Sequence, residues 1–298
     1  MPELPEVESL RRSLEKVILG QTVRKIEVLA PKLVSGKGNV RTPSPAKTKA
    51  FVSGLEKEKI ISIDRRAKNL IFRFSHGKVM IVHLKMTGQL VYKEKGKKPV
   101  TGGHPIELSE TELPNKHTRL IFHLGRGTLY YNDTRMFGYL LYHKSLEEAE
   151  KLGHFSDLGV EPLDAGFTLE YFRDSLKARR GTLKKVLMDQ KVVTGLGNIY
   201  ADEVAYEAGV RPTRQIAKVT GAEIEKLYKA IKRTMEAAIS LGGSSVADYL
   251  LADGSRGNYA REHKVYGKTG ENCPKCGTKL RTLQLNGRTT VYCPQCQK

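Results

Sequence analysis

The sequence predicts an α+β protein that combines an N-terminal helix and a β-sandwich with a helical domain and a C-terminal zinc hairpin. Three observations support this fold class. Short β-branched and aromatic runs fill the first half of the chain, helical periodicity replaces them after about residue 150, and all four cysteines lie near the C-terminus. A chain of 298 residues is long enough for two domains and a small appendage, which we expect at 1–150, 151–262 and 263–298.

The first 150 residues are typical of one helix followed by many short strands. Residues 5–19 place a proline in the first turn and apolar side chains on one helical face. Residues 93–117 carry too much charge, glycine and proline for a core strand, so they predict a long surface loop. Other short runs between Thr22 and about His143 favour a sandwich or barrel: TVRKIEVL, KIISID, NLIFRF, KVMIVHLKM, TRLIFHLG, TLYY and GYLLYH.

Four segments predict the helical domain: LEYFRDSL, TLKKVLMDQ, NIYADEVAYEAG and GAEIEKLYKAIKRTMEAAISLGG. Between the second and third lie residues 191–198, whose glycines permit tight turns. We expect Asn198 to cap a helix that begins at Ile199, where free backbone N–H groups could bind a phosphate. Ordinary turn chemistry explains the same pattern equally well.

The four cysteines form two C-x2-C pairs separated by residues 277–292: Cys273 with Cys276, and Cys293 with Cys296. This spacing is typical of a zinc site. Four thiolates complete a tetrahedral shell around Zn²⁺, so we expect one structural ion that takes no part in chemistry. Disulfides are the weaker alternative, because the chain does not open with a signal peptide.

A hairpin is predicted inside this zinc module. Asn286 and Gly287 are typical of a two-residue turn between strands at 279–285 and 288–292. Arg288 would then lie at the tip, where an exposed guanidinium could hold a phosphate through two hydrogen bonds. A solvated arginine without a ligand is the alternative.

The charge of the chain favours an anionic partner. Its formal net charge is +19, which predicts salt-sensitive binding to nucleic acid. An acidic membrane surface, or a generally basic proteome, would be the alternative explanation. No stretch approaches the roughly 20 apolar residues that cross a bilayer. We expect a monomer in the cytoplasm, associated with the nucleoid.

The opening residues, MPELPE, could supply an unusual nucleophile. Methionine before proline is normally removed, which would leave the secondary amine of Pro2 as the N-terminus. An α-amino group has a pKa of about 8, below that of lysine, so a useful fraction is unprotonated at neutral pH. Pro2 could form a Schiff base, with Glu3 and Glu6 as acids or bases. Alternatively, Pro5 and Glu6 only start a helix.

Six motifs follow one another along essentially the whole chain. They are MPELPE at 1–6, RRAK at 65–68, HLKMTG at 83–88, NDTRMFG at 132–138, VTGLGNIYADE at 193–203 and RTTVYCPQC at 288–296. Together they resemble bacterial formamidopyrimidine-DNA glycosylase. Leu4 fits that family, whereas its sister group, endonuclease VIII, usually begins MPEGPE.

The resemblance implies a bifunctional DNA glycosylase and AP lyase of base excision repair. Its substrate would be double-stranded DNA with abasic sites or with oxidised purines such as 8-oxoguanine and formamidopyrimidines. Pro2 would attack C1′ of the damaged nucleoside, and Glu3 would move protons around the ring oxygen and the departing base. The resemblance assigns proton transfer in base excision and β-elimination to Lys68. It assigns δ-elimination and phosphate clamping to Arg288.

The resemblance also implies a helix-two-turn-helix element in the helical domain and a damaged nucleotide flipped out of the duplex. Met86 and Phe137 would fill the hole, and Arg135 would bond to the orphaned base, usually cytosine. Residues 244–258 would cover the flipped base. The remaining contacts to the DNA backbone would come from His117, Arg179 and Asn198.

The chain departs from the family at one motif, where NDTRMF replaces the commoner DPRRF. Arg135 and Phe137 keep their places, but the loop loses a proline and a second arginine that would add stiffness and phosphate affinity. Two alternatives remain: an endonuclease VIII-like glycosylase for oxidised pyrimidines, and a noncatalytic DNA-binding relative. Leu4 weighs against the first, and the joint presence of Pro2, Glu3 and Lys68 weighs against the second.

Overall fold

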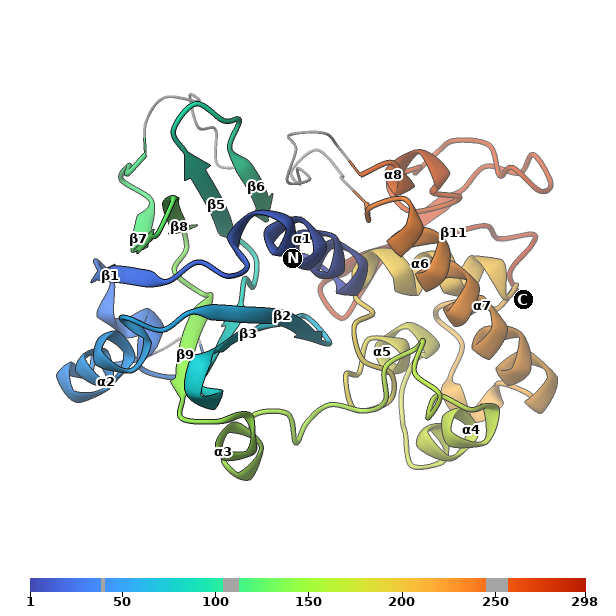
Figure 1. The fold of residues 1–298 in the computed structure, drawn as a ribbon. Helices are drawn as coiled ribbons and strands as arrows, with labels where there is room; N and C mark the ends of the chain where they lie inside the picture. Colours follow the sequence, from blue (N-terminus) through green and yellow to red (C-terminus); the bar gives the residue numbers. More distant parts are fainter. Residues whose placement is uncertain (39–40, 104–112, 245–256) are drawn as a thin grey trace. The chain divides into compact units, whose positions relative to one another are not determined.

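The chain folds into two compact units, each of which has its own hydrophobic core (Figure 1). The computed structural model describes residues 1–38, 41–103, 113–244 and 257–298. No helix in these ranges combines the length and the apolar character needed to cross a membrane. The N-terminal unit comprises Met1–Ser156 with Gly242–Gly257, and the C-terminal unit comprises Asp157–Leu241 with Asn258–Lys298.

The N-terminal unit is a sandwich of two antiparallel sheets. In spatial order the five-stranded sheet is β1 (Val23–Val28), β7 (Thr118–Leu124), β8 (Gly127–Asp133), β5 (Gly88–Glu94) and β6 (Val100–Gly103). The four-stranded sheet is β2 (Ile60–Arg66), β3 (Asn69–Phe74), β4 (Val79–His83) and β9 (Tyr139–His143). Their apolar side chains form one core, which includes Phe72, Leu90, Phe122 and Tyr131.

Two helices cover the edge strands of this sandwich, which protects strands that could otherwise pair with another chain. Helix α1 (Leu4–Ile18) packs against β2 and β6, which are edge strands of different sheets. Helix α2 (Pro45–Leu55) packs against β1 and β9, the two opposite edges (Figure 1). The short elements of this unit are η1 (Pro31–Val34), η2 (Ser75–Gly77) and α3 (Leu146–Lys151).

The C-terminal unit contains a helical bundle and a small hairpin. Its helices are α4 (Leu169–Lys177), α5 (Leu183–Leu187), α6 (Asn198–Glu207), η3 (Ile216–Lys218), α7 (Gly221–Ser240) and α8 (Tyr259–Glu262). Thr220 and Glu223 cap α7 reciprocally, because each side chain accepts the other's backbone N–H, at 3.3 and 2.9 Å. Strands β10 (Arg281–Leu285) and β11 (Arg288–Tyr292) pair on either side of Asn286 and Gly287.

The α+β fold class and the helix at 5–19 are confirmed, but two local expectations need correction. Residues 93–117 are not one loop, because β5 extends to Glu94 and β6 occupies Val100–Gly103. Asn198 is not a cap, since it is the first residue of α6 and Gly197 is the N-cap. The expected cover at 244–258 lies outside the described residues except at its two ends.

Candidate functional site

The start of the chain is buried in the N-terminal unit. Pro2 and Glu3 are both buried, whereas Met1 is 48% exposed. The carboxylate of Glu6 accepts the backbone N–H groups of Glu3, at 2.8 Å, and Ser244, at 2.7 Å. The side chain of Glu3 accepts the backbone N–H of Glu6 in return, so the two glutamates cap the start of α1 reciprocally beside Pro2.

Lys68 lies in a tight turn that is tied to the helix following Pro2. The β2–β3 turn consists of Ala67, at φ +53°, and Lys68, which is only 5% exposed. Arg65 donates both to Glu8 of α1, at 3.0 Å, and to the carbonyl of Ala67, at 3.1 Å. This chain of contacts fixes the lysine turn against the helix that carries the N-terminus.

Glu8 remains ionised in this arrangement. Burial raises its pKa, but hydrogen bonds from Arg11 and Arg12 and the charge of Arg65 outweigh burial, so the pKa falls to about 2. The anion at the centre keeps the three guanidinium groups together near the start of the chain.

Met86, Arg135 and Phe137 lie together on two neighbouring loops. The guanidinium of Arg135 lies 4.5 Å from the ring centroid of Phe137, and its Nη1 atom lies 3.8 Å from the sulfur of Met86. Met86 is 46% exposed, an unusual position for such a side chain, and Arg135 is also exposed. An exposed cluster of one thioether, one ring and one planar cation has the chemistry required to enter a base stack.

His117 lies next to these loops through its backbone. Its carbonyl accepts the N–H of Asp133, at 3.0 Å, where β8 ends. Burial and the nearby charges of Lys116 and Arg119 lower the pKa of His117 below its usual value. The lower pKa favours the neutral ring, which could donate one hydrogen bond to a phosphate oxygen.

Asn198 and Arg288 lie on elements that a buried ion pair holds together in the C-terminal unit. Asn198 begins α6, and Asp202 follows it one turn later. Lys184 of α5 contacts Asp202 at 2.8 Å and donates to the carbonyl of Thr289 at 2.9 Å. Asp202 in turn accepts the N–H of Val291 of β11, at 3.1 Å. The sequence does not reveal this pair, because Lys184, Asp202 and Val291 come from three separate segments.

Arg288 occupies the predicted hairpin tip. It is exposed and lies opposite Leu285, directly after Asn286 and Gly287, whose φ angles are +51° and +70°. Arg179, by contrast, is already paired with Asp189, at 3.1 Å. It can reach a DNA phosphate only if it shares or leaves this partner.

The four cysteines fit one tetrahedral metal ion. Their sulfur atoms all lie within 4.8 Å of one another, with 3.8 Å between Cys273 and Cys296 and 3.5 Å between Cys276 and Cys293. Tetrahedral zinc with Zn–S bonds of about 2.3 Å requires sulfur atoms roughly 3.8 Å apart. The hydroxyl of Tyr206 on α6 lies 3.2 Å from the sulfur of Cys273 and so supports one ligand from outside the hairpin.

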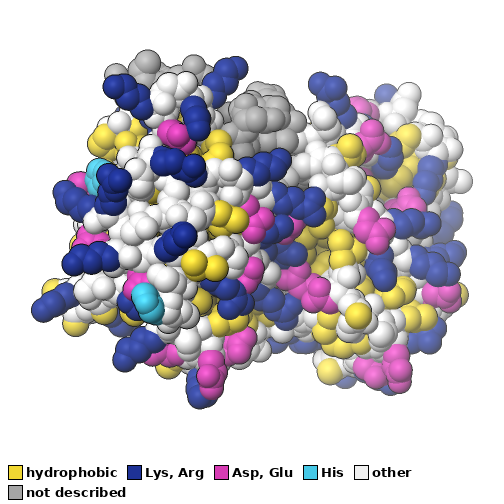
Figure 2. Space-filling model, viewed as in Figure 1, with side chains coloured by type: hydrophobic (Ala, Val, Ile, Leu, Met, Phe, Trp, Pro, Cys, Tyr) yellow, Lys and Arg dark blue, Asp and Glu magenta, His cyan; other side chains and the backbone are white. Residues whose placement is uncertain are grey.

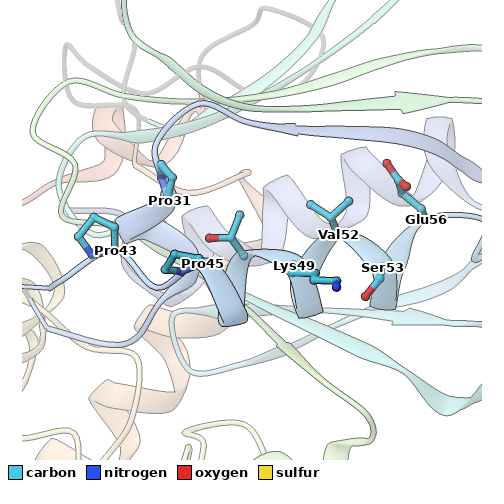
Figure 3. A pocket seen from close by; sticks show the side chains of 8 residues that line it. Pro31, Pro43, Pro45, Lys49, Val52, Ser53 and Glu56 are labelled. Atoms are coloured by element: carbon cyan, nitrogen blue, oxygen red, sulfur yellow. The ribbon is translucent and has the colours of Figure 1, made fainter.

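Positive charge is distributed widely over the surface. Figure 2 shows Lys and Arg side chains spread over the visible face with acidic side chains among them. A pocket of about 590 Å³ lies beside α2 and is lined mainly by apolar groups, including Pro31, Pro45 and Val52 (Figure 3). None of the predicted site residues lines this pocket, so we place no part of the site there.

Comparisons with known proteins agree along the chain. Residues 1–140 match the family model of the formamidopyrimidine-DNA glycosylase N-terminal domain, 158–249 its H2TH domain, and 270–298 the zinc finger found in FPG and IleRS. The formamidopyrimidine-DNA glycosylase of Desulfitobacterium hafniense is 39% identical over 297 residues, and that of Bacillus subtilis is 38% identical over 298. These alignments cover 100% of this chain and 100% and 99% of the relatives.

Solved structures give the same result. A Lactococcus lactis Fpg bound to DNA with an abasic site has a TM-score of 0.84 at 33% identity, with 99% of both chains covered. A MutM bound to DNA with carbocyclic 8-oxo-G has a TM-score of 0.83 at 33% identity, with 100% of both chains covered. A variant Lactococcus lactis FPG bound to DNA containing Fapy-dG has a TM-score of 0.84 at 33% identity, with 100% of both chains covered.

Proposed function

Because this chain belongs to the formamidopyrimidine-DNA glycosylase family, we propose that it excises oxidised purines from double-stranded DNA with the nitrogen of Pro2 as nucleophile. It is a DNA glycosylase and AP lyase with a zinc finger, as is typical of that family. The substrate class is supported by relatives solved with Fapy-dG, 8-oxo-G and abasic DNA. The observation that carries the residue assignment is the buried Pro2–Glu3 start, joined through Glu8 and Arg65 to the turn that bears Lys68.

Removal of Met1 exposes the secondary amine of Pro2. The amine attacks C1′ of the damaged nucleoside, and the bond between the sugar and the base breaks. Glu3 supplies a proton at the ring oxygen or the departing base, and the buried Lys68 shares this proton transfer. Both electrons of the broken bond leave with the base, and the nitrogen of Pro2 loses its proton to give an aminal at C1′. The nitrogen lone pair then opens the C1′–O4′ bond as the ring oxygen takes a proton, which gives the iminium ion between Pro2 and C1′.

The iminium ion then allows the strand to be cut twice. It withdraws electrons from C1′ and acidifies the 2′ hydrogens, so a base can remove one and expel the 3′ phosphate. A second elimination expels the 5′ phosphate and leaves a gap of one nucleotide. Lys68 acts in the first elimination, and Arg288 acts in the second while it clamps a phosphate.

The remaining site residues hold the duplex open. Met86 and Phe137 fill the space left by the flipped nucleotide, and Arg135 bonds to the orphaned cytosine. His117, Arg179 and Asn198 contact phosphates. Asn198 suits phosphate contact because it is the first residue of α6, and the N-terminus of a helix attracts anions.

We further propose that catalysis belongs to 1–150, DNA binding to 151–262 and the zinc finger to 263–298. The four cysteines would hold Zn²⁺, which stabilises the hairpin that carries Arg288 and supplies no reacting group. The net charge of +19 supports residence on the nucleoid.

Borohydride trapping tests the proposal. Wild-type protein should form a covalent adduct with a duplex that carries 8-oxoguanine opposite cytosine, because borohydride reduces the iminium ion. Pro2→Gly should form none at the same enzyme concentration, since the secondary amine is lost. Pro5→Gly is the matched control and should still form the adduct, because it leaves the N-terminal residue intact. Adducts only with oxidised pyrimidines would favour the endonuclease VIII-like alternative, and no adduct with any lesion would favour a noncatalytic protein.

A further inference from the structure

The loop that carries Arg135 and Phe137 is held from one side by an anion. Asp133 is fully buried, and its carboxylate accepts the N–H of Met136, at 3.0 Å, and the N–H of Gly138, at 2.8 Å. The hydroxyl of Thr87, beside Met86, also donates to this carboxylate, and its oxygen accepts the N–H of Arg135, at 3.2 Å. The backbone N–H groups of the loop are therefore fixed from within the sandwich.

A cation holds the same loop from the other side. Arg41, which lies between η1 and α2, donates from Nη2 to the carbonyl of Met136, at 2.8 Å, and from Nη1 to the carbonyl of Gly138, at 2.7 Å. Nη1 also contacts the carbonyl of Gly36, at 3.2 Å. These carbonyls belong to the residues before and after Phe137, so one planar guanidinium fixes the backbone around that residue.

This second support offsets strain in the loop. Met136 has φ +54°, a conformation that residues with a side chain rarely adopt, so the loop needs outside contacts to keep it. Arg41 supplies two such contacts, at the carbonyls of Met136 and Gly138.

We propose that Arg41 is a positioning residue that sets selectivity for the base opposite the lesion. It holds the Arg135–Phe137 turn so that the guanidinium of Arg135 faces the orphaned cytosine. This inference rests on the proposed glycosylase function and on the proposed role of Arg135. Both terminal nitrogens of Arg41 donate to backbone carbonyls of its own unit, which is the contact pattern of a positioning residue.

The test compares excision of 8-oxoguanine opposite cytosine with excision opposite adenine under single-turnover conditions. Wild-type protein should prefer cytosine, and Arg41→Ala should reduce this preference roughly tenfold, because two charge-assisted hydrogen bonds to the loop are lost. Arg41→Lys should restore part of the preference. The matched control is Arg24→Ala, which removes the charge of an exposed arginine on β1 and should leave the preference unchanged.

Both duplexes are assayed with one preparation of each variant, so partial unfolding cancels from the ratio. A double variant supplies an independent check: Arg41→Ala should have little further effect once Arg135→Ala has removed the guanidinium that faces the opposite base. An unchanged ratio in Arg41→Ala, or losses that simply multiply in the double variant, would overturn the positioning role. A wild-type protein that excises no 8-oxoguanine would instead contradict the proposed function itself.

Discussion

At the scale of single residues, Glu8 carries the negative charge that holds Arg65 and, through it, the turn that contains Lys68. Its carboxylate accepts hydrogen bonds from Arg11 and Arg12 of its own helix and from Arg65 of β2. Its pKa in the folded chain, about 2, lies below the ordinary value of 4.5. Glu8 therefore stabilises the fold above pH 4.5, and this contribution is lost as the pH falls towards 2.

We expect Glu8→Gln to lower the free energy of unfolding at pH 7 by up to about 3 kcal/mol. The variant should also show a weaker loss of stability between pH 5 and pH 2 than the wild type. Urea unfolding at several pH values measures both effects. Glu15→Gln is the control, since Glu15 pairs only with Arg11 among the ion pairs at this site and is more exposed. Parallel pH curves for wild type and Glu8→Gln would contradict the argument.

Arg288 provides a prediction about the reaction itself. Arg288→Ala should slow the second elimination, so the product of β-elimination accumulates, and DNA binding should weaken because a phosphate contact is lost. Gel analysis of the cleaved strand over time separates the two products. Arg281→Ala removes another exposed arginine of the same hairpin and should leave the product ratio unchanged. A wild-type ratio in Arg288→Ala would remove Arg288 from this step.

The sequence was sufficient to predict the position of a residue in the fold where its contacts lie close to it in the chain. The cysteine spacing and the Asn286–Gly287 turn predicted the metal cluster and the position of Arg288. It was not sufficient for Glu6, whose carboxylate accepts the N–H of Ser244 from the far end of the chain. The roles of Pro2, Glu3 and Lys68 stay predictions, because they come from the resemblance to the family.

At the scale of secondary-structure elements, the contact between α1 and β6 is unusually close. A Cβ atom added to Gly102 would lie 2.3 Å from a methyl carbon of Leu10. The glycine therefore lets the helix that follows Pro2 and Glu3 settle against this edge of the sandwich. Gly102 and its neighbour Gly103 also lower the β propensity of this segment. For this reason the sequence predicted a loop here and missed β6.

Gly102→Ala should destabilise the N-terminal unit by about 1–3 kcal/mol, because Leu10 or the strand must shift. Thermal unfolding and single-turnover excision should both report this shift, since α1 positions the start of the chain. Gly125→Ala is the matched control, as a Cβ atom there meets nothing within 4 Å. Equal melting temperatures for both variants would show that Leu10 and β6 accommodate the added methyl group without strain.

Helix α2 also escaped prediction for a physical reason. Only Phe51, Gly54 and Leu55 of this helix are buried, so its sequence has little apolar periodicity. A glycine at 54 is needed because a Cβ atom there would lie 2.4 Å from the ring of Tyr142. Close packing on β9, rather than helix propensity, explains this residue.

At the scale of the whole molecule, the zinc module depends on the helical unit. Tyr206 of α6 reaches Cys273, and the Lys184–Asp202 pair anchors β11. The sequence predicted a separate zinc finger, but it could not predict these contacts, because they join segments distant in the chain. The hairpin that bears Arg288 belongs to the same compact unit as α6.

Metal removal should therefore affect the two units differently. Chelation, or Cys276→Ser, should abolish specific DNA binding and expose the amides of β10 and β11, while β3, β4, β7 and β8 keep their protection. Hydrogen exchange and DNA-binding titrations on the full chain measure these effects, and added zinc should restore binding after chelation. Full binding by the metal-free protein would contradict this prediction.

The most direct test of the chemistry is to locate the covalent bond. The adduct trapped by borohydride should be digested and sequenced by mass spectrometry. We predict that the deoxyribose fragment is attached to the nitrogen of Pro2 in a peptide that has lost Met1. Attachment to a lysine side chain, or full activity in protein that retains Met1, would contradict the central claim.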